Sequence, residues 1–274
     1  MNRFFSIQTG LIALLSFFLY SSQLFAKTIV ISDIDDTLKK ANSMGKPAEE
    51  AYHFLKKIPY LEMRDLFNEI KLNELKHNES VEYYYVSAAV DLTFNAQKWL
   101  VKNNFPIGRS TLKTIKTKQS TYEFKYAVIK QIIQQVQKNI DVIEGENLHI
   151  LMFGDNAQAD ALVYSDLSKE LNLETQIFIR DVRAEATFFD SSIAVKRIPG
   201  IKYYFSEVEL FNYPEFSFIS DDLKKQSLVD YQQRVLIPAY TFKTLERRLE
   251  AITNDKKRAS REAQKFWNDY YTRF

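Results

Sequence analysis

Residues 28–37 read TIVISDIDDT, and they carry the clearest structural signal in the chain. Thr28–Ser32 is a β-branched run without polar alternation, which is typical of a strand buried on both faces. Acidic residues follow at once, with Asp33 and Asp35 two positions apart. Because residues i and i+2 of an extended segment point to the same side, these carboxylates repel unless a cation or a division of roles separates them. The stretch therefore predicts a buried strand that carries a reactive carboxylate pair at its carboxyl end.

Strand and helix patterns alternate along the chain after this stretch. Further strands are predicted at 82–86, 148–153, 176–179 and 202–205. Helices are predicted within 91–103, 123–138 and 159–171, and within 46–76 with a break at Ile58-Pro59. Such alternation is typical of an α/β fold, and we predict a Rossmann-like three-layer sandwich around a mostly parallel sheet. The order of the strands in the sheet stays open.

Polar side chains stand at the ends of the first three predicted strands. These residues are Asp33, Ser87 and Asp155. In an open parallel sheet, ligands bind at the carboxyl ends of the strands. A single Asp after a strand is usually a helix cap, but three polar ends in succession favour an active site.

The residue types at these strand ends suit phosphoryl transfer. Magnesium prefers oxygen ligands, so the carboxylates are candidate ligands. A carboxylate such as Asp33 can also act as a nucleophile, while Asp35 can protonate the leaving oxygen and later activate water. Ser87 can donate a hydrogen bond to the phosphoryl oxygens. The negative charge also needs a lysine, and we favour Lys125, near the start of a helix, over four others: Lys113, Lys116, Lys118 and Lys130.

The composition excludes several other kinds of chemistry. The 274 residues include no cysteine, which excludes disulfides, cysteine nucleophiles and thiolate metal sites. The three histidines lie far apart, so no H-x-x-x-H zinc pair exists. The net charge of +2 gives no global field that would favour a nucleic-acid partner.

Several motifs together resemble those of a known family. The stretches ISDIDDTLK, YYYVSAA, EFKYAVIKQII and FGDNAQADALVY, in this order, resemble the motifs of the haloacid dehalogenase superfamily. More narrowly, residues from about Lys27 to Val182 look like the catalytic domain of actin-patch-type phosphatidate phosphatases. The resemblance implies a phosphatase domain over 27–210, with a small helical cap inserted at about 40–80. It also implies Mg²⁺-dependent hydrolysis of a phosphomonoester, such as the lipid phosphatidate, through an aspartyl-phosphate.

The resemblance assigns roles to individual residues. It implies Asp33 as nucleophile and magnesium ligand, and Asp35 as general acid and base that binds the metal through its backbone carbonyl. Asp155 would bind magnesium, and Asp160 would lie near the metal, either as a ligand or behind one. Lys125 would hold the charge. The substrate side would involve Ser87, the neighbouring Ala88, and Thr37 in the active-site turn.

Two departures from the family pattern concern substrate contacts. Ala88-Ala89-Val90 stands where members often have Asn and then Ser and Pro, and Asn156-Ala157 replaces a common Ser-Gly. The alternative functions are therefore a catalytically silent binding module of the same fold and a soluble small-molecule acid phosphatase.

The two ends of the chain carry further signals. Residues 1–26 combine Arg3, a short apolar run and a small-residue exit at Ala26, so they resemble a cleaved secretory leader. The expected location is then secreted or periplasmic, and an uncleaved membrane anchor is the alternative.

We expect residues 211–274 to form a helical extension. Its last part, Tyr240–Phe274, has nine basic and five acidic residues, and it either packs on the domain or contacts an anionic membrane.

Overall fold

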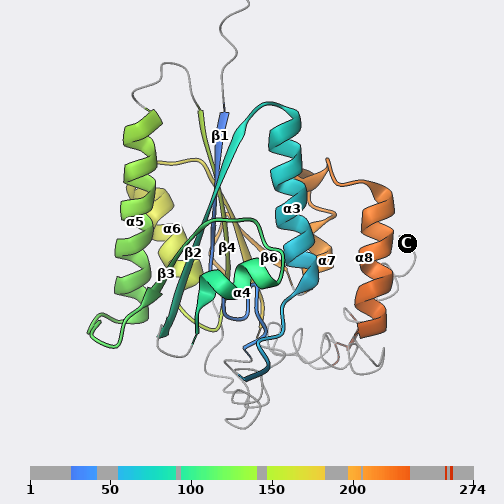
Figure 1. The fold of residues 1–274 in the computed structure, drawn as a ribbon, viewed down its shortest axis with the longest axis horizontal. Helices are drawn as coiled ribbons and strands as arrows, with labels where there is room; N and C mark the ends of the chain where they lie inside the picture. The colour runs from blue at the N-terminus through green and yellow to red at the C-terminus, as the bar shows by residue number, and fades with distance from the viewer. Residues whose placement is uncertain are drawn as a thin grey trace, which may run out of the picture.

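The computed structural model describes residues 26–41, 55–90, 94–140, 147–182, 197–204 and 206–234, together with residues 257, 260 and 261. In this part of the chain six strands form one sheet in the order β3-β2-β1-β4-β5-β6, and every neighbouring pair is parallel (Figure 1). The α/β fold predicted from the sequence is confirmed. The strands are β1 (Ala26–Ser32), β2 (Ser80–Val90), β3 (Arg109–Lys113), β4 (Asn147–Asp155), β5 (Thr175–Arg180) and β6 (Ile201–Tyr204).

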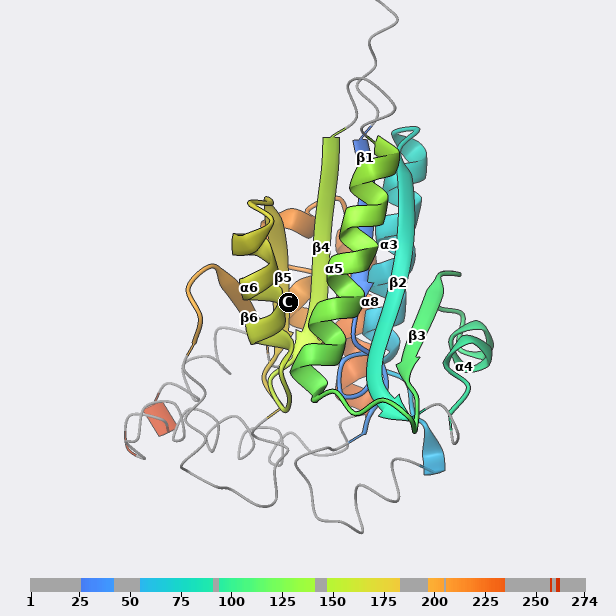
Figure 2. The ribbon, with the colours of Figure 1, turned by 90° about the vertical axis from the view of Figure 1, so that its left-hand side faces the viewer.

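Helices cover both faces of the sheet and complete three layers. Helices α5 and α6 lie on one face, and α3, α4, α7 and α8 lie on the other (Figures 1 and 2). Their bounds are α3 (Leu61–Lys76), α4 (Ala96–Lys102), α5 (Thr121–Ile140), α6 (Asp160–Glu170), α7 (Glu207–Leu210), the 3₁₀ turn η1 (Pro214–Phe216) and α8 (Asp221–Arg234).

The position of β1 in the middle of the sheet explains why its sequence shows no polar alternation. Ile29 and Ile31 pack in the core beneath α5 and α6, whereas Val30 packs on the opposite side with residues of α3. All three side chains are fully buried, because helices cover both faces of the sheet. Because neither face meets water, neighbouring positions of Ile29–Ile31 are all apolar.

The strand order reverses between β1 and β4. From β1 the chain builds outward through β2 to β3, and it then returns past β1 to build β4, β5 and β6 on the other side. Connections that leave in opposite directions open a crevice beyond the carboxyl ends of the two central strands, where ligands bind in such sheets. Asp33 and Asp155 therefore stand at the switch point of the sheet.

Helix α3 packs directly against the sheet and is not part of a cap. Leu66 and Phe67 are fully buried in the core with Tyr83 of β2 and Phe153 of β4. Any cap within the expected 40–80 insertion is therefore limited to residues before Leu61, and of these 42–54 lie outside the described residues. Strand β3 is an addition that the sequence patterns did not predict.

The segment after β6 is part of the same core. Leu210, Phe211, Phe216 and Ile219 are buried together with Phe178 of β5. Most of 235–274, including the basic tail, lies outside the described residues, as do residues 1–25 of the expected leader. None of the helices in the part of the chain described here is long and apolar enough to cross a membrane.

Candidate active site

The site begins where β1 and β4 end side by side. The backbone N–H of Asp33 donates to the carbonyl oxygen of Phe153 at 2.9 Å, which continues the ladder beyond β1. Asp155 is the last residue of β4. Both aspartates are almost completely buried. The parallel pairing of these strands therefore brings together two carboxylates that are more than a hundred residues apart in sequence.

Lys125 reaches this edge from the first turns of α5. Its Nζ donates to Asp33 Oδ1 at 2.7 Å and to Asp160 Oδ1 at 2.5 Å, and the lysine is 1% exposed. Two other candidate lysines lie elsewhere: Lys113 contacts the carbonyl of Gln119, and Lys130 contacts Glu170. The structure thus places the favoured lysine beside the first aspartate.

Asp160 holds both Lys125 and the backbone of Asp155 in place. While its Oδ1 accepts from Lys125, its Oδ2 accepts from the backbone N–H of Asp155 at 3.2 Å. The close approach depends on Gly154, because a Cβ at this position would lie 2.6 Å from the Cβ of Asp160. Gly154 is therefore required by packing, a role that the strand pattern alone did not predict.

The charges in this cluster are unbalanced, and the pKa values respond. Burial raises the pKa of Asp33 to about 8, because the nearby Asp160 and Asp35 add to it and the ion pair with Lys125 offsets only part of the effect. Burial and the same kind of repulsion raise the pKa of Asp155. Burial alone would lower the pKa of Lys125, but the carboxylates of Asp160, Asp33 and Asp155 outweigh it and raise that pKa. Three carboxylates share one ammonium group.

This donor set fits a divalent cation. Asp33, Asp155 and Asp160 each offer a carboxylate oxygen, and these oxygens lie within 4.8 Å of one another. The cluster holds three potential negative charges against one positive charge, so a cation of charge +2 would balance it. Hard oxygen ligands of this kind suit Mg²⁺. A metal can therefore bind here.

Asp35 lies apart from the cluster, in contact with two other groups. Its Oδ2 accepts a hydrogen bond from the Ser87 hydroxyl at 2.9 Å, and its Oδ1 lies 2.5 Å from the Nζ of Lys39. Lys39 is fully buried, and the sequence interpretation missed it. The only signal was its position four residues after Asp35. Ala88 is half-buried beside Ser87 in β2.

A tight turn connects the two aspartates to the rest of the chain. Asp36 adopts the left-handed region with φ 55°, and its Oδ1 accepts from the backbone N–H of Ala41 at 2.9 Å. The backbone N–H groups of Leu38 and Lys39 both donate to the carbonyl of Ile34, at 2.9 and 2.8 Å. Asp36, which had no predicted role, thus holds the turn.

Thr37 is fully buried in the same turn. Its hydroxyl oxygen has no hydrogen-bond partner within the described residues.

Two further polar residues, Arg180 and Asn156, make hydrogen bonds at the carboxyl ends of β5 and β4. Arg180 donates to Glu207 Oε1 at 2.7 Å and to the carbonyl of Asp36 at 3.4 Å, and its guanidinium lies 4.2 Å from the centre of the Tyr60 ring. Asn156 donates to Asp181 at 2.9 Å. These contacts connect the turn after β1 with the ends of β4 and β5.

The fold and the site define an α/β protein with a carboxylate and lysine centre at the switch point of its sheet. Residues 28–181 match the family model described as phosphatidate phosphatase APP1, catalytic domain. The match covers more than half of the 274 residues, so the chain belongs to this family of phosphatases. The family predicted from the sequence motifs is confirmed. A comparison with curated proteins found no match.

Proposed function

We propose that the protein is a magnesium-dependent phosphatase of the haloacid dehalogenase type, which hydrolyses a phosphomonoester through an aspartyl-phosphate on Asp33. The observation that carries this proposal is the buried cluster at the switch point. There Lys125 holds Asp33 and Asp160 at 2.7 and 2.5 Å. A nucleophilic carboxylate needs a fixed position and a nearby positive charge, and this arrangement supplies both.

We assign the metal to Asp33 and Asp155. Within the described part of the chain, each keeps one carboxylate oxygen without a hydrogen-bond donor, whereas both oxygens of Asp160 accept hydrogen bonds. Asp160 is then the group behind the ligands that positions Lys125. The family resemblance adds the backbone carbonyl of Asp35 as a ligand. Bound Mg²⁺ would neutralise charge on the phosphoryl oxygens.

The first chemical step uses the two aspartates of the first motif in different roles. A carboxylate oxygen of Asp33 forms a bond to phosphorus while the bond from phosphorus to the ester oxygen breaks. Asp35 donates its proton to that leaving oxygen. The side chain of Asp35 is 16% exposed, so it can meet a substrate oxygen, and Ser87 and Lys39 hold it in place.

The second step returns the enzyme to its starting state. Asp35, now a carboxylate, accepts a proton from a water molecule that attacks phosphorus, and the bond to Asp33 breaks. Inorganic phosphate leaves. Lys125 stabilises the Asp33 carboxylate as it is released.

We propose a lipid phosphate such as phosphatidate as the substrate, because the chain belongs to a family described by that activity. We further propose that a leader of 26 residues is removed and that the mature protein, which begins at Lys27, acts outside the cytoplasm.

A substrate panel tests this function. Mature protein is assayed with p-nitrophenyl phosphate, glycerol phosphate and micellar phosphatidate, with Mg²⁺ or with EDTA. We expect the highest kcat/KM for phosphatidate, and no turnover in EDTA or in Asp33→Asn. Hydrolysis of soluble esters alone would favour a small-molecule phosphatase. Binding of phosphate esters without any turnover would favour a silent binding module.

A further inference from the structure

The connection between β3 and α5 is a short basic loop with an apolar tip. Ile115 is 70% exposed, and Lys116 and Lys118 beside it are exposed as well. Within the described part of the chain neither lysine pairs with a carboxylate, and residues 109–122 include no acidic side chain. Their positive charges are therefore available to an anionic partner. We call residues 114–118 the basic loop.

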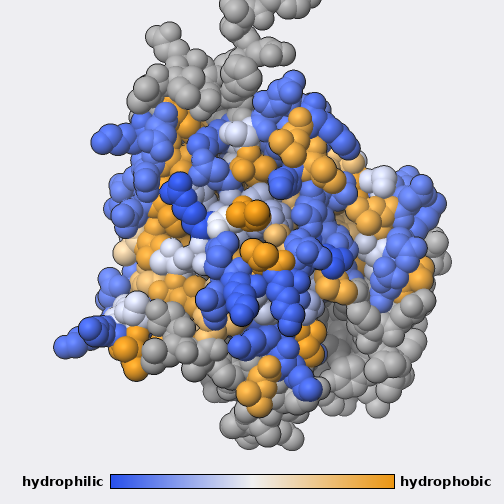
Figure 3. All heavy atoms as spheres, viewed as in Figure 1, coloured by the Kyte–Doolittle hydropathy of each residue, from blue (hydrophilic) through white to orange (hydrophobic). Residues whose placement is uncertain are grey.

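The basic loop stands at the same edge of the sheet as the candidate active site. Strand β3 is parallel to the other strands, so it ends at the edge where Asp33 and Asp155 lie. After the loop, α5 begins at Thr121, and within its first two turns it brings Lys125 to Asp33. The loop projects from the molecule at the level of the strand ends (Figure 1), and hydrophilic and hydrophobic side chains stand side by side there (Figure 3).

Hydrogen bonds within the loop define its shape. The backbone N–H of Thr117 donates to the carbonyl oxygen of Thr114 at 3.0 Å, and the backbone N–H of Thr114 donates to the hydroxyl of Thr117 at 3.2 Å. Ile115 is a central residue of this turn. The first acidic residue after the loop, Glu123, accepts from the backbone N–H of Ser120 at 2.8 Å and so caps the start of α5. A loop that is ordered before it binds loses little conformational entropy on binding.

The side chains of the loop suit the surface of an anionic membrane. An aliphatic group gains free energy when it leaves water for the boundary of the acyl chains, and nearby ammonium groups are attracted to lipid phosphates. Lysine can bury its aliphatic stem while its charged end stays among the headgroups. An acidic peptide would pair with Lys116 and Lys118 but would leave Ile115 in water. A lipid surface therefore fits the loop better.

We propose that the basic loop docks the protein on an anionic bilayer, with Ile115 inserted at the interface while Lys116 and Lys118 bind the phosphate groups of neighbouring lipids. Because the loop leads directly into α5, docking would turn the edge that carries Asp33 and Lys125 toward the bilayer. The inference rests on the proposed function, since a lipid phosphate has to be reached in its membrane. It deepens that function by naming the surface through which the protein meets its substrate.

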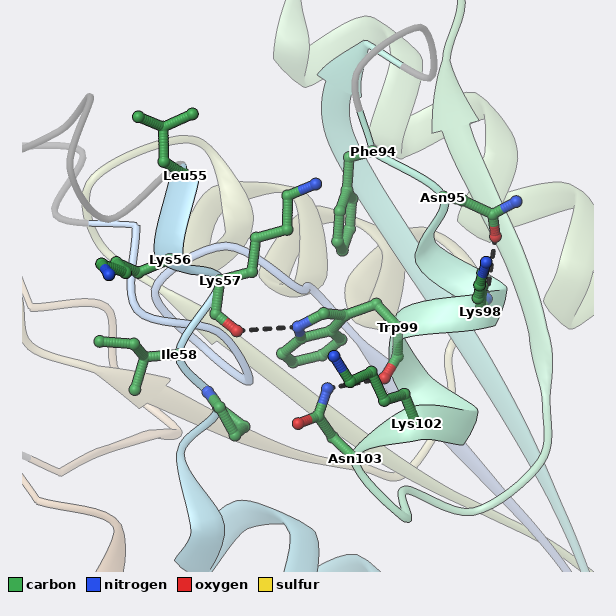
Figure 4. A pocket seen from close by; sticks show the side chains of 11 residues that line it. Leu55, Lys56, Lys57, Ile58, Phe94, Asn95, Lys98, Trp99, Lys102 and Asn103 are labelled. Atoms are coloured by element: carbon green, nitrogen blue, oxygen red, sulfur yellow. Dashed lines mark hydrogen bonds between the residues drawn. The ribbon is translucent and has the colours of Figure 1, made fainter.

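A probe on the loop tests the insertion directly. Native fluorescence of Trp99 does not serve, because this residue lines a pocket of about 470 Å³ beside α4, where its indole N–H donates to the carbonyl oxygen of Lys57 at 2.9 Å (Figure 4). The chain contains no cysteine, so Ile115→Cys creates a single site for the environment-sensitive fluorophore NBD. The matched control is Leu75→Cys, at a position that is 57% exposed at the end of α3, beside the start of β2 and thus at the opposite edge of the sheet.

The emission of the two labelled proteins is compared in EDTA and without substrate. Each full chain is mixed with vesicles of pure phosphatidylcholine, or with vesicles that also contain about 20 mol% phosphatidylglycerol, an anionic phosphodiester. With the anionic vesicles, the label on Ile115→Cys should shift to shorter wavelength and brighten about twofold, and the label on Leu75→Cys should not change. No change at either position, or equal changes at both, would overturn the proposal.

Charge variants test the contribution of the two lysines. Lys116→Gln/Lys118→Gln should weaken co-sedimentation with the anionic vesicles about tenfold, because each lysine near an anionic surface adds to the attraction. Lys76→Gln/Lys138→Gln removes two exposed lysines at the opposite edge of the sheet and should bind like the wild type. Melting temperatures within a few degrees of the wild type would show that both variants are folded. Equal binding by the wild type and both variants would contradict the role of the loop.

Two further outcomes separate this inference from its alternatives. A label on Ile115→Cys that responds to polyglutamate and not to the vesicles would assign the loop to an acidic protein and overturn the lipid proposal. If the substrate panel shows no turnover while the label still reports insertion, the proposed function fails and the docking surface stands. If phosphatidate is hydrolysed while the label reports no insertion, the docking surface fails and the proposed function stands.

Discussion

The two carboxylates of the first motif lie two residues apart but in different surroundings. Asp33 has a 3% exposed side chain and shares Lys125 with Asp160, whereas Asp35 is 16% exposed and contacts Lys39 and a hydroxyl. Each carboxylate has its own lysine. Lys125 comes from 92 residues away, while Lys39 stands four residues from its partner.

The comparison shows how a repulsive carboxylate pair can be used. On the buried side, Asp33, Asp155 and Asp160 hold negative charge that a cation can balance. On the more exposed side, Asp35 can exchange a proton with a substrate or with water. The division of roles thus follows from where each side chain lies. Substitutions can therefore change one side and leave the other intact.

The largest expected effect is on the nucleophile side. Asp33→Asn should lower kcat by at least about a thousandfold for every phosphate ester, because the amide that replaces the carboxylate is too weak a nucleophile to form the covalent bond. Steady-state assays on several esters would measure it. A variant that retained a tenth of the wild-type rate would contradict the assignment.

Asp35→Asn should reveal a different pattern. Its kcat on glycerol phosphate should fall by about 10²–10⁴, since the alkoxide leaves poorly without a proton. With p-nitrophenyl phosphate the first step needs no acid, so a burst of about one nitrophenol per enzyme should precede slow turnover. Rapid-quench kinetics would detect the burst. Equal losses on both esters without a burst would assign Asp35 a merely structural role.

The two lysines should differ in their effect on stability. Lys125→Met leaves buried carboxylates without their ammonium partner and should lower the free energy of unfolding by about 3–5 kcal/mol. Lys39→Met faces a more exposed carboxylate that keeps its hydrogen bond from Ser87, so a loss of about 1–2 kcal/mol is expected. Urea unfolding in EDTA would compare them. The reverse order would contradict the difference between the two sides.

The buried side should also couple stability to pH. Burial raises the pKa of Asp33 from 3.8 to about 8, so between these values the folded, metal-free protein binds a proton that the unfolded chain has released. This contribution to stability therefore decreases as the pH rises from about 4 to 8. Mg²⁺ competes with that proton, so its affinity should rise with pH, by at most about tenfold per unit.

Melting temperatures with Mg²⁺ and with EDTA at pH 6 and pH 8 would measure this coupling. The increase caused by Mg²⁺ should be larger at pH 8, and Asp33→Asn should reduce the difference between the two pH values. An increase that is the same at both would argue against a metal bound by this carboxylate.

The smallest effect is expected at Ser87. Ser87→Ala removes one hydroxyl proton, which is donated to Asp35 in the structure and would be donated to a phosphoryl oxygen when substrate is bound. The loss of this one donor should lower kcat/KM by about five- to tenfold. The melting temperature with Mg²⁺ should be unchanged, because the hydroxyl contacts only the more exposed side. A loss of the Mg²⁺ effect would show that the two sides are not separate.

Much of the sheet could be predicted from local patterns. The strand at Thr28–Ser32 stands out as a continuous β-branched run that is buried on both faces. The helix of Lys125 stands out because its apolar residues repeat at helical spacing. The short strand β3 did not stand out, since RSTLK lies at the sheet edge, where burial imposes no period. The start of α3 at Leu61 agrees with the break that the sequence predicts at Ile58-Pro59.

Some residues of the candidate site could likewise be predicted from the sequence, and others could not. Asp33, Asp35 and Asp155 could be found because they follow buried strands, and a parallel sheet brings such ends to one edge. Lys39 and Gly154 could not, because their importance lies in a contact rather than in a pattern. One balances a carboxylate, and the other makes room for Asp160.

The α/β class, the family and the carboxylates at the edge of the sheet could be predicted without coordinates, because they depend on the order and pattern of residues along the chain. The strand order, the partner of each carboxylate and the contact of Arg180 with Glu207 depend instead on tertiary packing. These features join segments that are distant in sequence. Their geometry follows from how helices pack on the two faces of the sheet, which no local pattern encodes.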